Sequence, residues 1–380
     1  MAGGCSAEMD DPGSPPSVRS MDIDLGERSY SIHVGNGIVS STGHLIRKRL
    51  PQVRTCGVVT SDGIPEIHVE ALTGSLESAG LNIGIVKVPD GEEAKSWEVA
   101  GDLIGELLDI GLDRRSAVIA FGGGAIGDLA GFAAAIYMRG VSLVQVPTTL
   151  LAQVDSSYGG KTAVNHPKGK NLIGAFYQPS LVVSDQGILG TLPRRELLSG
   201  MGEVVKHGVI ADPELFKLTE TEGERLMNAD PDALSEAVIR SVAIKGRLVQ
   251  KDERDDKGAR AILNYGHTIG HALETMSHHG LRHGEAVTLG MEVAARISLS
   301  LRLMASKDVE RQTKTLESIG FDLNPPESDL KTLMEVTHRD KKAVGDTINL
   351  VLPTGIGKSP IVKGVQDSLI LETLKGMGYG

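Results

Sequence analysis

Apolar and polar positions along the first half of the chain repeat with the two periods typical of strands and helices. Residues 21–35 (MDIDLGERSYSIHVG) alternate at every second position around Gly26, which predicts a half-buried β-hairpin. Beyond this hairpin, short apolar runs and amphipathic helical stretches follow one another. Strands are predicted at 55–61, 82–89, 116–124 and 141–149, and helices at 64–80, 94–111 and 128–138. This order predicts a mostly parallel sheet that is covered by helices on both faces.

From about residue 190 the pattern changes to helical periods with few β-branched runs, and helices are predicted at 193–210, 230–253 and 283–303. A chain of 380 residues is also long for one hydrophobic core, so two domains are expected. We therefore predict an α/β fold with a Rossmann-like, mostly parallel sheet domain at 21–189 and a mainly α-helical domain at 190–380. Residues 1–20 show neither period and are predicted to be a disordered tail.

Composition and charge exclude several classes of protein. The two cysteines, Cys5 and Cys56, are too few for a cysteine-based zinc site or a disulfide framework, so a reducing compartment fits. The net charge of −10 argues against a general nucleic-acid binder, although a local positive pocket for an anion remains compatible with it. The longest apolar run, near 130–138, is about half of the ~20 residues that a membrane span needs. We therefore expect a cytoplasmic protein that binds neither nucleic acid nor membranes.

A glycine turn, GGGAIG (122–127), follows a predicted strand and opens a helix. Its G-x-G-x-x-G spacing suits a pyrophosphate that rests on backbone N–H groups at a helix N-terminus. The ribose-binding acid expected about 20 residues later is missing, because Gln145 and its neighbours are neutral. Glu92 or Glu93, after the strand at 82–89, could supply that contact or could simply begin an exposed helix. The turn therefore predicts either a nucleotide site or a purely structural connection.

A segment rich in lysine and glycine occupies residues 154–174 and is predicted to be a flexible loop. Its GGKT resembles the end of a P-loop, but Asp155 stands where the first glycine of that motif belongs, so we reject this interpretation. Lys161, Lys168 and Lys170 could bring two or three ammonium groups to a phosphate or carboxylate, or could form a solvated loop. Asp155 and the nearby Asn171 favour a polar pocket.

Five histidines lie within residues 264–285, which are predicted to be largely helical. On one helix Asn264, His267 and His271 would share a face. The H-x-x-x-H spacing lacks the glutamate of a zinc protease, because Thr268 stands in its place, so a metalloprotease is unsupported.

A zinc site would need further ligands besides His267. His283 could provide one, and a carboxylate could come from Glu203 or Glu285. Nitrogen and carboxylate ligands with one open position are typical of a catalytic zinc. The alternative is that the histidines are ordinary core or surface residues, which is the interpretation we favour for His278 and His279.

The segment GEVVKHG (202–208) places Glu203 and Lys206 on one helix face. A lysine beside a cation site would be destabilised unless an anion also binds there. This pair therefore indicates an anionic substrate.

Several long motifs together resemble the 3-dehydroquinate synthase family of sugar-phosphate cyclases over residues 21–375. The densest are GGGAIGDLAGFAAAIYMRGV, QVPTTLLAQVDSSYGGKTAVNHPKGKNLIGAFYQP, TLPRRELLSGMGEVVKHGVI, ARAILNYGHTIGHALE and HGEAV. The resemblance implies that 3-deoxy-arabino-heptulosonate 7-phosphate is converted to 3-dehydroquinate and phosphate in the shikimate pathway. It also implies bound NAD, a divalent metal (zinc or cobalt) held by the helical domain, and a sequence of oxidation, phosphate elimination, re-reduction, ring opening and intramolecular aldol closure.

The same resemblance assigns roles to individual residues. It implies Glu203, His267 and His283 as metal ligands and His271 as a nearby proton-handling or substrate-orienting group. It implies NAD contacts from Asp90, Gly91, Glu92, Glu93, Ala94, Lys95, Gly124, Ala125, Ile126, Gly127, Asp128, Thr148, Thr149, Lys161, Lys170, Ile188, Leu189, Gly190 and Thr191. It implies substrate contacts from Arg139, Asp155, Lys161, Asn171, Lys206, Lys245, Arg260, Asn264 and Lys341, with Arg139 reaching the neighbouring active site of a homodimer.

Two departures from the family pattern and three alternatives remain. The segment TSDGIPE (60–66) lacks the Asp-x-Asn pattern that some members use for the adenosine ribose, so the contacts there are open. MGEVVKHG replaces the commoner AEVIKYG and keeps Glu203 and Lys206. The alternatives are another sugar-phosphate cyclase with a valiolone or deoxy-inosose product, a metal-dependent NAD dehydrogenase of the glycerol dehydrogenase type, and a non-catalytic domain.

Overall fold

A computed structural model describes residues 18–277, 280–341 and 347–380, without the side chains of residues 340 and 341. Most of the expected tail, with Cys5, and the histidines His278 and His279 lie outside the described residues. The first strand begins at Arg19, two residues inside the segment predicted to be disordered.

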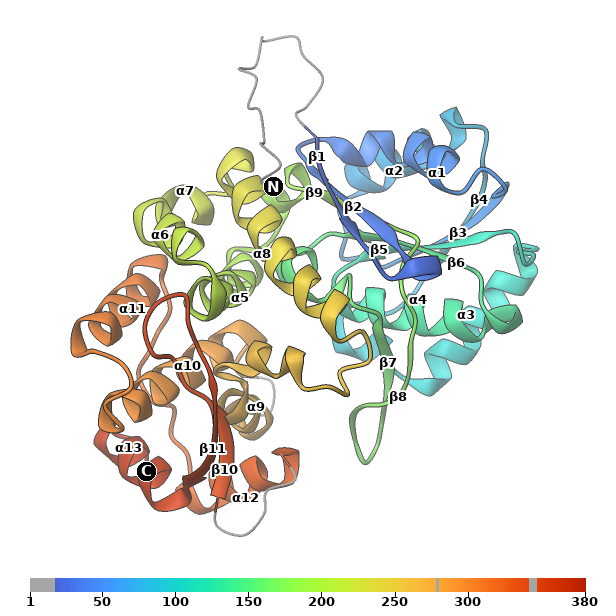
Figure 1. The fold of residues 1–380 in the computed structure, drawn as a ribbon. Helices are drawn as coiled ribbons and strands as arrows, with labels where there is room; N and C mark the ends of the chain where they lie inside the picture. Colours follow the sequence, from blue (N-terminus) through green and yellow to red (C-terminus); the bar gives the residue numbers. More distant parts are fainter. Residues whose placement is uncertain (1–17, 278–279, 342–346) are drawn as a thin grey trace.

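The described part of the N-terminal half contains a seven-stranded sheet with the order β1-β2-β9-β6-β5-β3-β4 (Figure 1). The first two strands form the predicted antiparallel hairpin, and every later pairing in the sheet is parallel. The strands are β1 Arg19–Ile23, β2 Tyr30–Gly35, β3 Thr55–Thr60, β4 Asn82–Lys87, β5 Ala117–Gly122, β6 Ser142–Pro147 and β9 Leu181–Asp185. The α/β fold class and the mostly parallel sheet are thereby confirmed.

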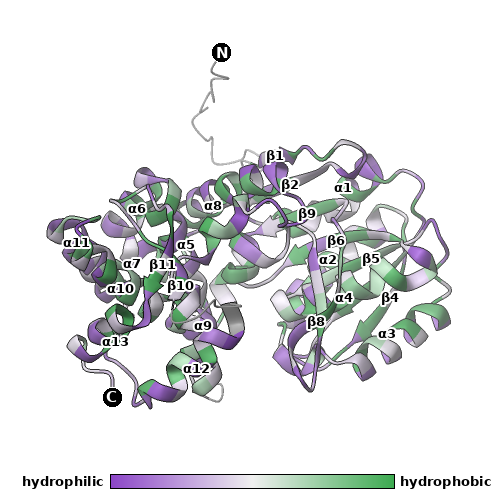
Figure 2. Ribbon diagram, turned by 60° about the horizontal axis from the view of Figure 1, so that its bottom comes forward, coloured by the Kyte–Doolittle hydropathy of each residue, from purple (hydrophilic) through white to green (hydrophobic). Residues whose placement is uncertain are grey.

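Helices cover both faces of this sheet, as the nearly continuous apolar strands require. Helices α1 (Thr42–Arg49) and α2 (Glu66–Ser78) bury one face in a cluster that includes Val58 and Phe121. Helices α3 (Trp97–Asp109) and α4 (Gly124–Ile136) bury the other face. Figure 2 shows the hydrophobic colour running through β4 and β5 between these helices.

The C-terminal half is mainly helical, as predicted, and its hydrophilic residues are prominent on α11 (Figure 2). The helices are α5 Arg194–Ala211, α6 Pro213–Thr221, α7 Gly223–Met227, α8 Pro231–Lys251, α9 His267–Met276, α10 His283–Ser300, α11 Ser306–Ile319, α12 Leu330–Lys341 and α13 Asp367–Gly376. An antiparallel pair, β10 (Thr347–Val351) and β11 (Ile361–Gln366), was not predicted. Among the described residues, no helix is both long and apolar enough to cross a bilayer.

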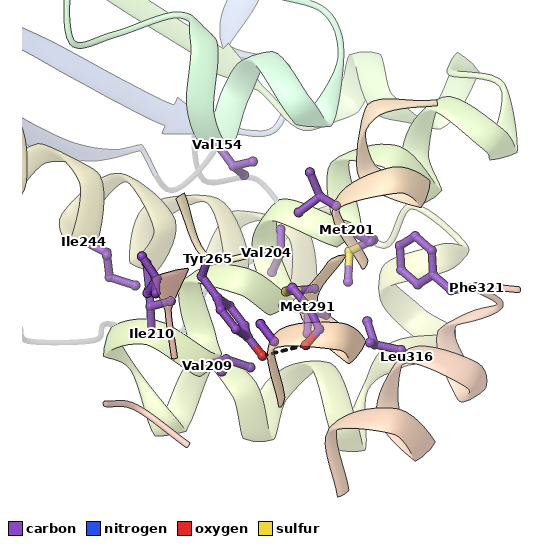
Figure 3. Close-up of a cluster of buried hydrophobic side chains, with 14 of the residues drawn as sticks. Val154, Met201, Val204, Val209, Ile210, Ile244, Tyr265, Met291, Leu316 and Phe321 are labelled. Carbon is purple, nitrogen blue, oxygen red and sulfur yellow. Dashed lines mark hydrogen bonds between the residues drawn. The ribbon is translucent and has the colours of Figure 1, made fainter. Parts of the chain in front are cut away.

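One large hydrophobic core joins the two halves. Figure 3 shows part of it, with Val154 from the sheet half facing Met201, Val204 and Tyr265 from the helical half. The edge hairpin β1–β2 belongs to the same core, and β1 packs against α8. The domain boundary at 189/190 stays a prediction.

Three local predictions were wrong. The lysine-rich segment is not a flexible loop but a second antiparallel hairpin, β7 (Lys161–His166) and β8 (Gly169–Phe176), which projects from the sheet half (Figure 1). Helix α4 begins at Gly124, four residues earlier than expected. Helix α9 begins only at His267, because Gly266 adopts a left-handed φ of 77°, so Asn264 belongs to a preceding 3₁₀ helix (Ala259–Asn264) and not to the same helix face.

Candidate active site

Three side chains from different helices converge where α5, α9 and α10 meet. The Nε2 atoms of His267 and His283 each lie 3.5 Å from Oε1 of Glu203. One potential ligand atom from each of these residues lies within 4.8 Å of the other two, which is close enough to hold one metal ion. Glu285, the alternative carboxylate, is engaged elsewhere: it accepts a hydrogen bond from the backbone N–H of Arg282 (2.8 Å) and pairs with Arg195.

Glycines allow the backbones of these helices to touch. A Cβ atom on Gly284, at the start of α10, would lie 2.0 Å from the carbonyl oxygen of Ser199 in α5. A Cβ atom on Gly290 would lie 1.9 Å from the carbonyl oxygen of Gly266, just before α9. A side chain at either position would force the helices apart, so these glycines set the short distances between the three converging groups.

Glu203 is fully buried and needs positive charge beside it. Within the described part of the chain, neither of its carboxylate oxygens accepts a hydrogen bond of regular geometry, although Oε2 forms an ion pair with Lys206. Burial raises the pKa of Glu203, but Lys206 and His267 outweigh this effect and hold it well below its usual range. An ionised carboxylate that faces two imidazole nitrogens fits a divalent cation, which would compensate the buried charge.

Hydrogen bonds at the far side of each imidazole direct Nε2 toward Glu203. Nδ1 of His267 lies 3.1 Å from the carbonyl oxygen of Tyr265, and Nδ1 of His283 lies 3.1 Å from Oε2 of Glu274. Burial and Lys206 lower the pKa of His267 well below its ordinary value, so this ring is neutral and Nδ1 donates to the carbonyl. Burial lowers the pKa of His283, but the neighbouring carboxylates of Glu203 and Glu274 prevail and raise it to about 9.

His271, one turn after His267, lies beside the same group. Its ring centroid is 5.0 Å from that of His267 and 6.0 Å from that of His283. This position is compatible with the predicted role near the metal and substrate.

Buried cationic side chains lie near Glu203, His267 and His283, toward the sheet half. Lys206 pairs with Glu203, and Nζ of Lys245 lies 2.8 Å from Oδ1 of Asp155. Arg260 is almost buried and donates to the carbonyl oxygen of Gly159 (3.2 Å). The predicted residues Asp155, Lys206, Lys245 and Arg260 are thus brought together.

His207 belongs to this cluster and was missed from the sequence. Its ring is fully buried, neither nitrogen has a hydrogen-bond partner among the described residues, and one of its ring nitrogens lies within 4.8 Å of carboxylate oxygens of Asp155 and Glu203. Burial, followed by Lys206, lowers the pKa of His207 to about 3. The signal was available, because His207 follows Glu203 by four residues on one helix.

The β7–β8 hairpin carries two of the predicted lysines to carboxylates of the helical half. Nζ of Lys161 lies 2.5 Å from Oδ2 of Asp255, and Nζ of Lys170 lies 3.1 Å from Oε1 of Glu274. Lys168 is exposed at the turn. Asp255 and Glu274 were not singled out from the sequence, although Glu274 lies two helical turns after His267.

The glycine turn (122–127) lies close to Asp155 and the buried cations. Helix α4 begins at Gly124, and the backbone N–H groups at a helix N-terminus can bind an anion. A Cβ atom on Gly124 would lie 2.8 Å from Oγ of Ser156, and Ser156 directly follows Asp155. At the neighbouring strand end, the backbone N–H of Thr148 donates to the carbonyl oxygen of Gly122 (3.0 Å). The carboxyl ends of the central strands β5 and β6 therefore carry the predicted NAD contacts Gly124–Asp128, Thr148 and Thr149.

The segment that follows β4, with Asp90 and Lys95, lies at the same end of the sheet. Nζ of Lys95 donates to Oδ2 of Asp128 (2.6 Å) and to Oδ1 of Asn171, and Oδ1 of Asp90 accepts from Oγ of Ser61 (2.9 Å). Beside it, a hollow of about 370 Å³ at the end of β3 is lined by Thr60, Ser61, Asp62, Gly63, Ile64, Pro65, Glu66, Val69 and Lys87. This hollow lies at residues 60–66, the segment that lacks the Asp-x-Asn pattern.

The segment Ile188–Thr191 borders this region from the next connection. Its residues form a 3₁₀ helix (Gly187–Thr191), in which Ile188 and Leu189 are buried in the core. Oγ1 of Thr191 lies 2.8 Å from Nε2 of His68, at the start of α2.

Three predicted residues are not joined to the cluster. The side chains of Arg139 and Asn264 are exposed and make no hydrogen bond or ion pair with other described residues. Lys341 ends α12, and its side chain lies outside the described part.

Solved structures first identify the class of enzyme to which this fold belongs. A crystal structure of 2-deoxy-scyllo-inosose synthase complexed with carbaglucose-6-phosphate, NAD+ and Co2+ superimposes with a TM-score of 0.86 and 30% sequence identity, covering 94% of this chain and 100% of that chain. A probable glycerol dehydrogenase from Sinorhizobium meliloti shares the fold more distantly, with a TM-score of 0.61, 14% identity, and coverage of 90% of this chain and 94% of that chain. The architecture is that of the sugar-phosphate cyclases.

Sequence comparison then narrows this class to one family. The family models for the 3-dehydroquinate synthase N-terminal and C-terminal domains match residues 85–199 and 200–343. The 3-dehydroquinate synthase of Pelotomaculum thermopropionicum is 44% identical over 96% of this chain and 98% of its own length. That of Symbiobacterium thermophilum is 46% identical over 93% of this chain and 100% of its own length. The chain belongs to the 3-dehydroquinate synthase family.

Proposed function

We propose that the protein converts 3-deoxy-arabino-heptulosonate 7-phosphate to 3-dehydroquinate and phosphate, the ring-forming reaction of the shikimate pathway of aromatic amino acid biosynthesis. The observation that carries this proposal is the position of two adjacent residues. Asp155 lies in the group with Glu203 and His207, whereas Ser156 lies against Gly124 of the glycine turn. A dinucleotide at the turn and a metal at the histidines would therefore meet at one pocket lined by buried cations.

Glu203, His267 and His283 would hold the divalent metal. One carboxylate oxygen and two imidazole nitrogens with room for further ligands suit zinc or cobalt at a catalytic site. When bound, the metal would supply a Lewis acid for the substrate hydroxyl groups.

NAD would bind at the carboxyl ends of the strands, between the glycine turn and the hollow at the end of β3. When bound, it would supply a hydride acceptor that returns the hydride within the same turnover. We assign its contacts to Asp90–Lys95, Gly124–Asp128, Thr148, Thr149, Lys161, Lys170 and Ile188–Thr191, and the ribose contact to the hollow that Ser61 and Asp62 line.

The remaining residues of the pocket would bind and orient the substrate. Lys206, Lys245 and Arg260 present positive charge that suits a carboxylate and a phosphate, with Lys161 and Asn171 approaching from the hairpin. Asp155 keeps Lys245 in place through their ion pair. His271 would move a proton or orient the substrate, and Asn264 and Lys341 would complete the pocket.

We propose a homodimer in which Arg139 reaches the neighbouring active site. Met138 and Arg139 both adopt left-handed backbone conformations, with φ angles of 47° and 70°, which are costly for residues other than glycine. Ile136 beside them and Phe176 on β8 are exposed apolar side chains, as an interface with a second copy would use.

We propose that the protein is located in the cytoplasm. Cys56 is buried and forms no disulfide with another described residue, which fits a reducing compartment.

A phosphate-release assay with the heptulosonate phosphate, with and without a chelator, tests the proposed reaction. We expect NAD-dependent release that the chelator abolishes and zinc or cobalt restores. Turnover of sedoheptulose 7-phosphate without phosphate release from the heptulosonate would indicate another cyclase. Net accumulation of NADH with a simple alcohol would indicate a dehydrogenase of the glycerol dehydrogenase type.

A further inference from the structure

Glu274 occupies a position between the candidate metal group and the β7–β8 hairpin. Its side chain, in α9, is 19% exposed and uses its two oxygens for different partners. Oε2 lies 3.1 Å from Nδ1 of His283, at the start of α10, and Oε1 lies 3.1 Å from Nζ of Lys170, on β8. One carboxylate therefore contacts two elements that are far apart in the sequence.

The first contact decides which nitrogen of His283 can bind a metal. A carboxylate accepts a hydrogen bond from Nδ1–H, so the lone pair of the neutral ring is at Nε2, the atom that faces Glu203. Carboxylates that hold ligating histidines in this way also increase their basicity and fix the ring orientation. His267 uses the backbone carbonyl of Tyr265 for the same purpose, so only His283 has an outer partner that a point mutation can remove.

The second contact connects this histidine to the sheet half. Asn171, next to Lys170, accepts a hydrogen bond from Nζ of Lys95, and its backbone N–H donates to Oδ1 of Asn165 (2.8 Å). The backbone N–H of Asn165 in turn donates to the carbonyl oxygen of Lys95 (2.7 Å). The turn end of the hairpin is thereby fastened to the segment after β4, and Lys170 carries that attachment to Glu274.

We propose that Glu274 is a positioning residue with two linked effects: it fixes His283 for metal binding and, through Lys170, couples metal occupancy to the placement of the β7–β8 hairpin. This inference rests on the proposed metal site. By thermodynamic linkage, the metal must favour the placed hairpin by the same factor by which the placed hairpin favours the metal. The Lys170 side chain is 48% exposed, so this factor should be only a few-fold.

Zinc affinity and hydrogen exchange measured on the same variants test both effects. Affinity would be measured by competition with a chromophoric chelator, and exchange of residues 161–176 by mass spectrometry with and without zinc. Glu274→Ala should weaken zinc binding about 10- to 100-fold. Glu274→Gln keeps an acceptor for Nδ1–H and should bind zinc more tightly than Glu274→Ala, but its hairpin should no longer respond to zinc.

Lys170→Met separates the two effects. It should weaken zinc binding only a few-fold while abolishing the zinc-dependent protection of the hairpin. Glu220→Ala is the matched control, because Glu220 is a partly exposed glutamate that pairs with Arg311 on other helices. It should change neither measurement.

Three results would overturn the inference. One is zinc affinity within twofold of the parent in Glu274→Ala, and another is equal loss of affinity in Glu274→Ala and Glu274→Gln without a change in metal-free melting temperature. The third is hairpin exchange in the parent that does not respond to bound zinc. A parent protein that binds no zinc would overturn the metal site itself and this inference with it, which distinguishes the two failures.

Discussion

Replacing Lys206 by methionine should change two properties in opposite directions. The metal-free protein should lose stability, and zinc should bind more tightly. Lys206 and Glu203 form an ion pair whose side chains are 1% and 0% exposed. Methionine fills most of the same volume but removes the ammonium group, so Glu203 loses its ion pair with Lys206.

The magnitude follows from the burial of the pair. Removing one partner of a buried ion pair costs about 3–5 kcal/mol. A divalent cation between Glu203, His267 and His283 would give positive charge to the same carboxylate, so the metal-bound protein should lose less. If the cation compensates about 2 kcal/mol of the loss, the Kd for zinc should fall about 30-fold, because each ~1.4 kcal/mol is a factor of ten.

Urea unfolding in the presence of a chelator measures the first effect, and chelator competition measures the second. Lys245→Met is the matched control, since it breaks the ion pair with the partly exposed Asp155 and leaves Glu203 paired. It should cost less stability and leave the zinc affinity nearly unchanged. A folded Lys206→Met protein that binds zinc no more tightly than the parent would refute the reasoning that Lys206 and the metal share one carboxylate.

Three further predictions concern the same group. His267→Ala should lose zinc and activity together, whereas His271→Ala should retain zinc, measured by metal analysis, while turnover falls about 10²- to 10⁴-fold; equal zinc loss in both would contradict the role of His271. The pKa of His283 is raised to about 9, so its protonation stabilises the metal-free protein fully below about pH 6.5, and this contribution is lost as the pH rises through about 9. Urea unfolding at these pH values should show the loss of stability, and His283→Asn should remove this pH dependence. Gly284→Ala would place a Cβ atom 2.0 Å from a carbonyl oxygen of α5 and should cost at least about 1–3 kcal/mol together with zinc binding, whereas Gly105→Ala, with open space in α3, should be neutral or stabilising in thermal unfolding.

Local periodicity predicted the elements that carry the site but not the distances between them. The run of buried residues in β5 and the helical spacing of Glu203 and Lys206 were visible in the sequence, and the structure contains both features. The choice between Glu203 and Glu285 was not visible, because both stand on predicted helices near histidines. It depends on Glu285 closing the N-terminus of α10 and pairing with Arg195, a contact across 90 residues.

The hairpin shows the other limit of periodicity. Residues 161–176 contain five glycines or lysines that interrupt any alternation, and the register of β7 and β8 shifts between Val164 and His166. Burial of Thr162 and Val164 against α4 makes this segment a strand, and that burial depends on the tertiary structure. A flexible loop was therefore the natural but wrong prediction.

The contacts that assemble the site arise where small residues allow two elements to touch. Gly284 and Gly290 bring α10 against α5 and the start of α9, and Gly124 brings α4 against Ser156. Each is a glycine within or beside a motif that could be recognised, yet its partner is a backbone or side-chain atom at a distant position in the sequence. The pattern of residues therefore indicates which groups can do the chemistry. The close approach of backbones at glycine decides their positions, so that Asp155 lies near Glu203 and His207 while its neighbour Ser156 lies against Gly124 of the glycine turn.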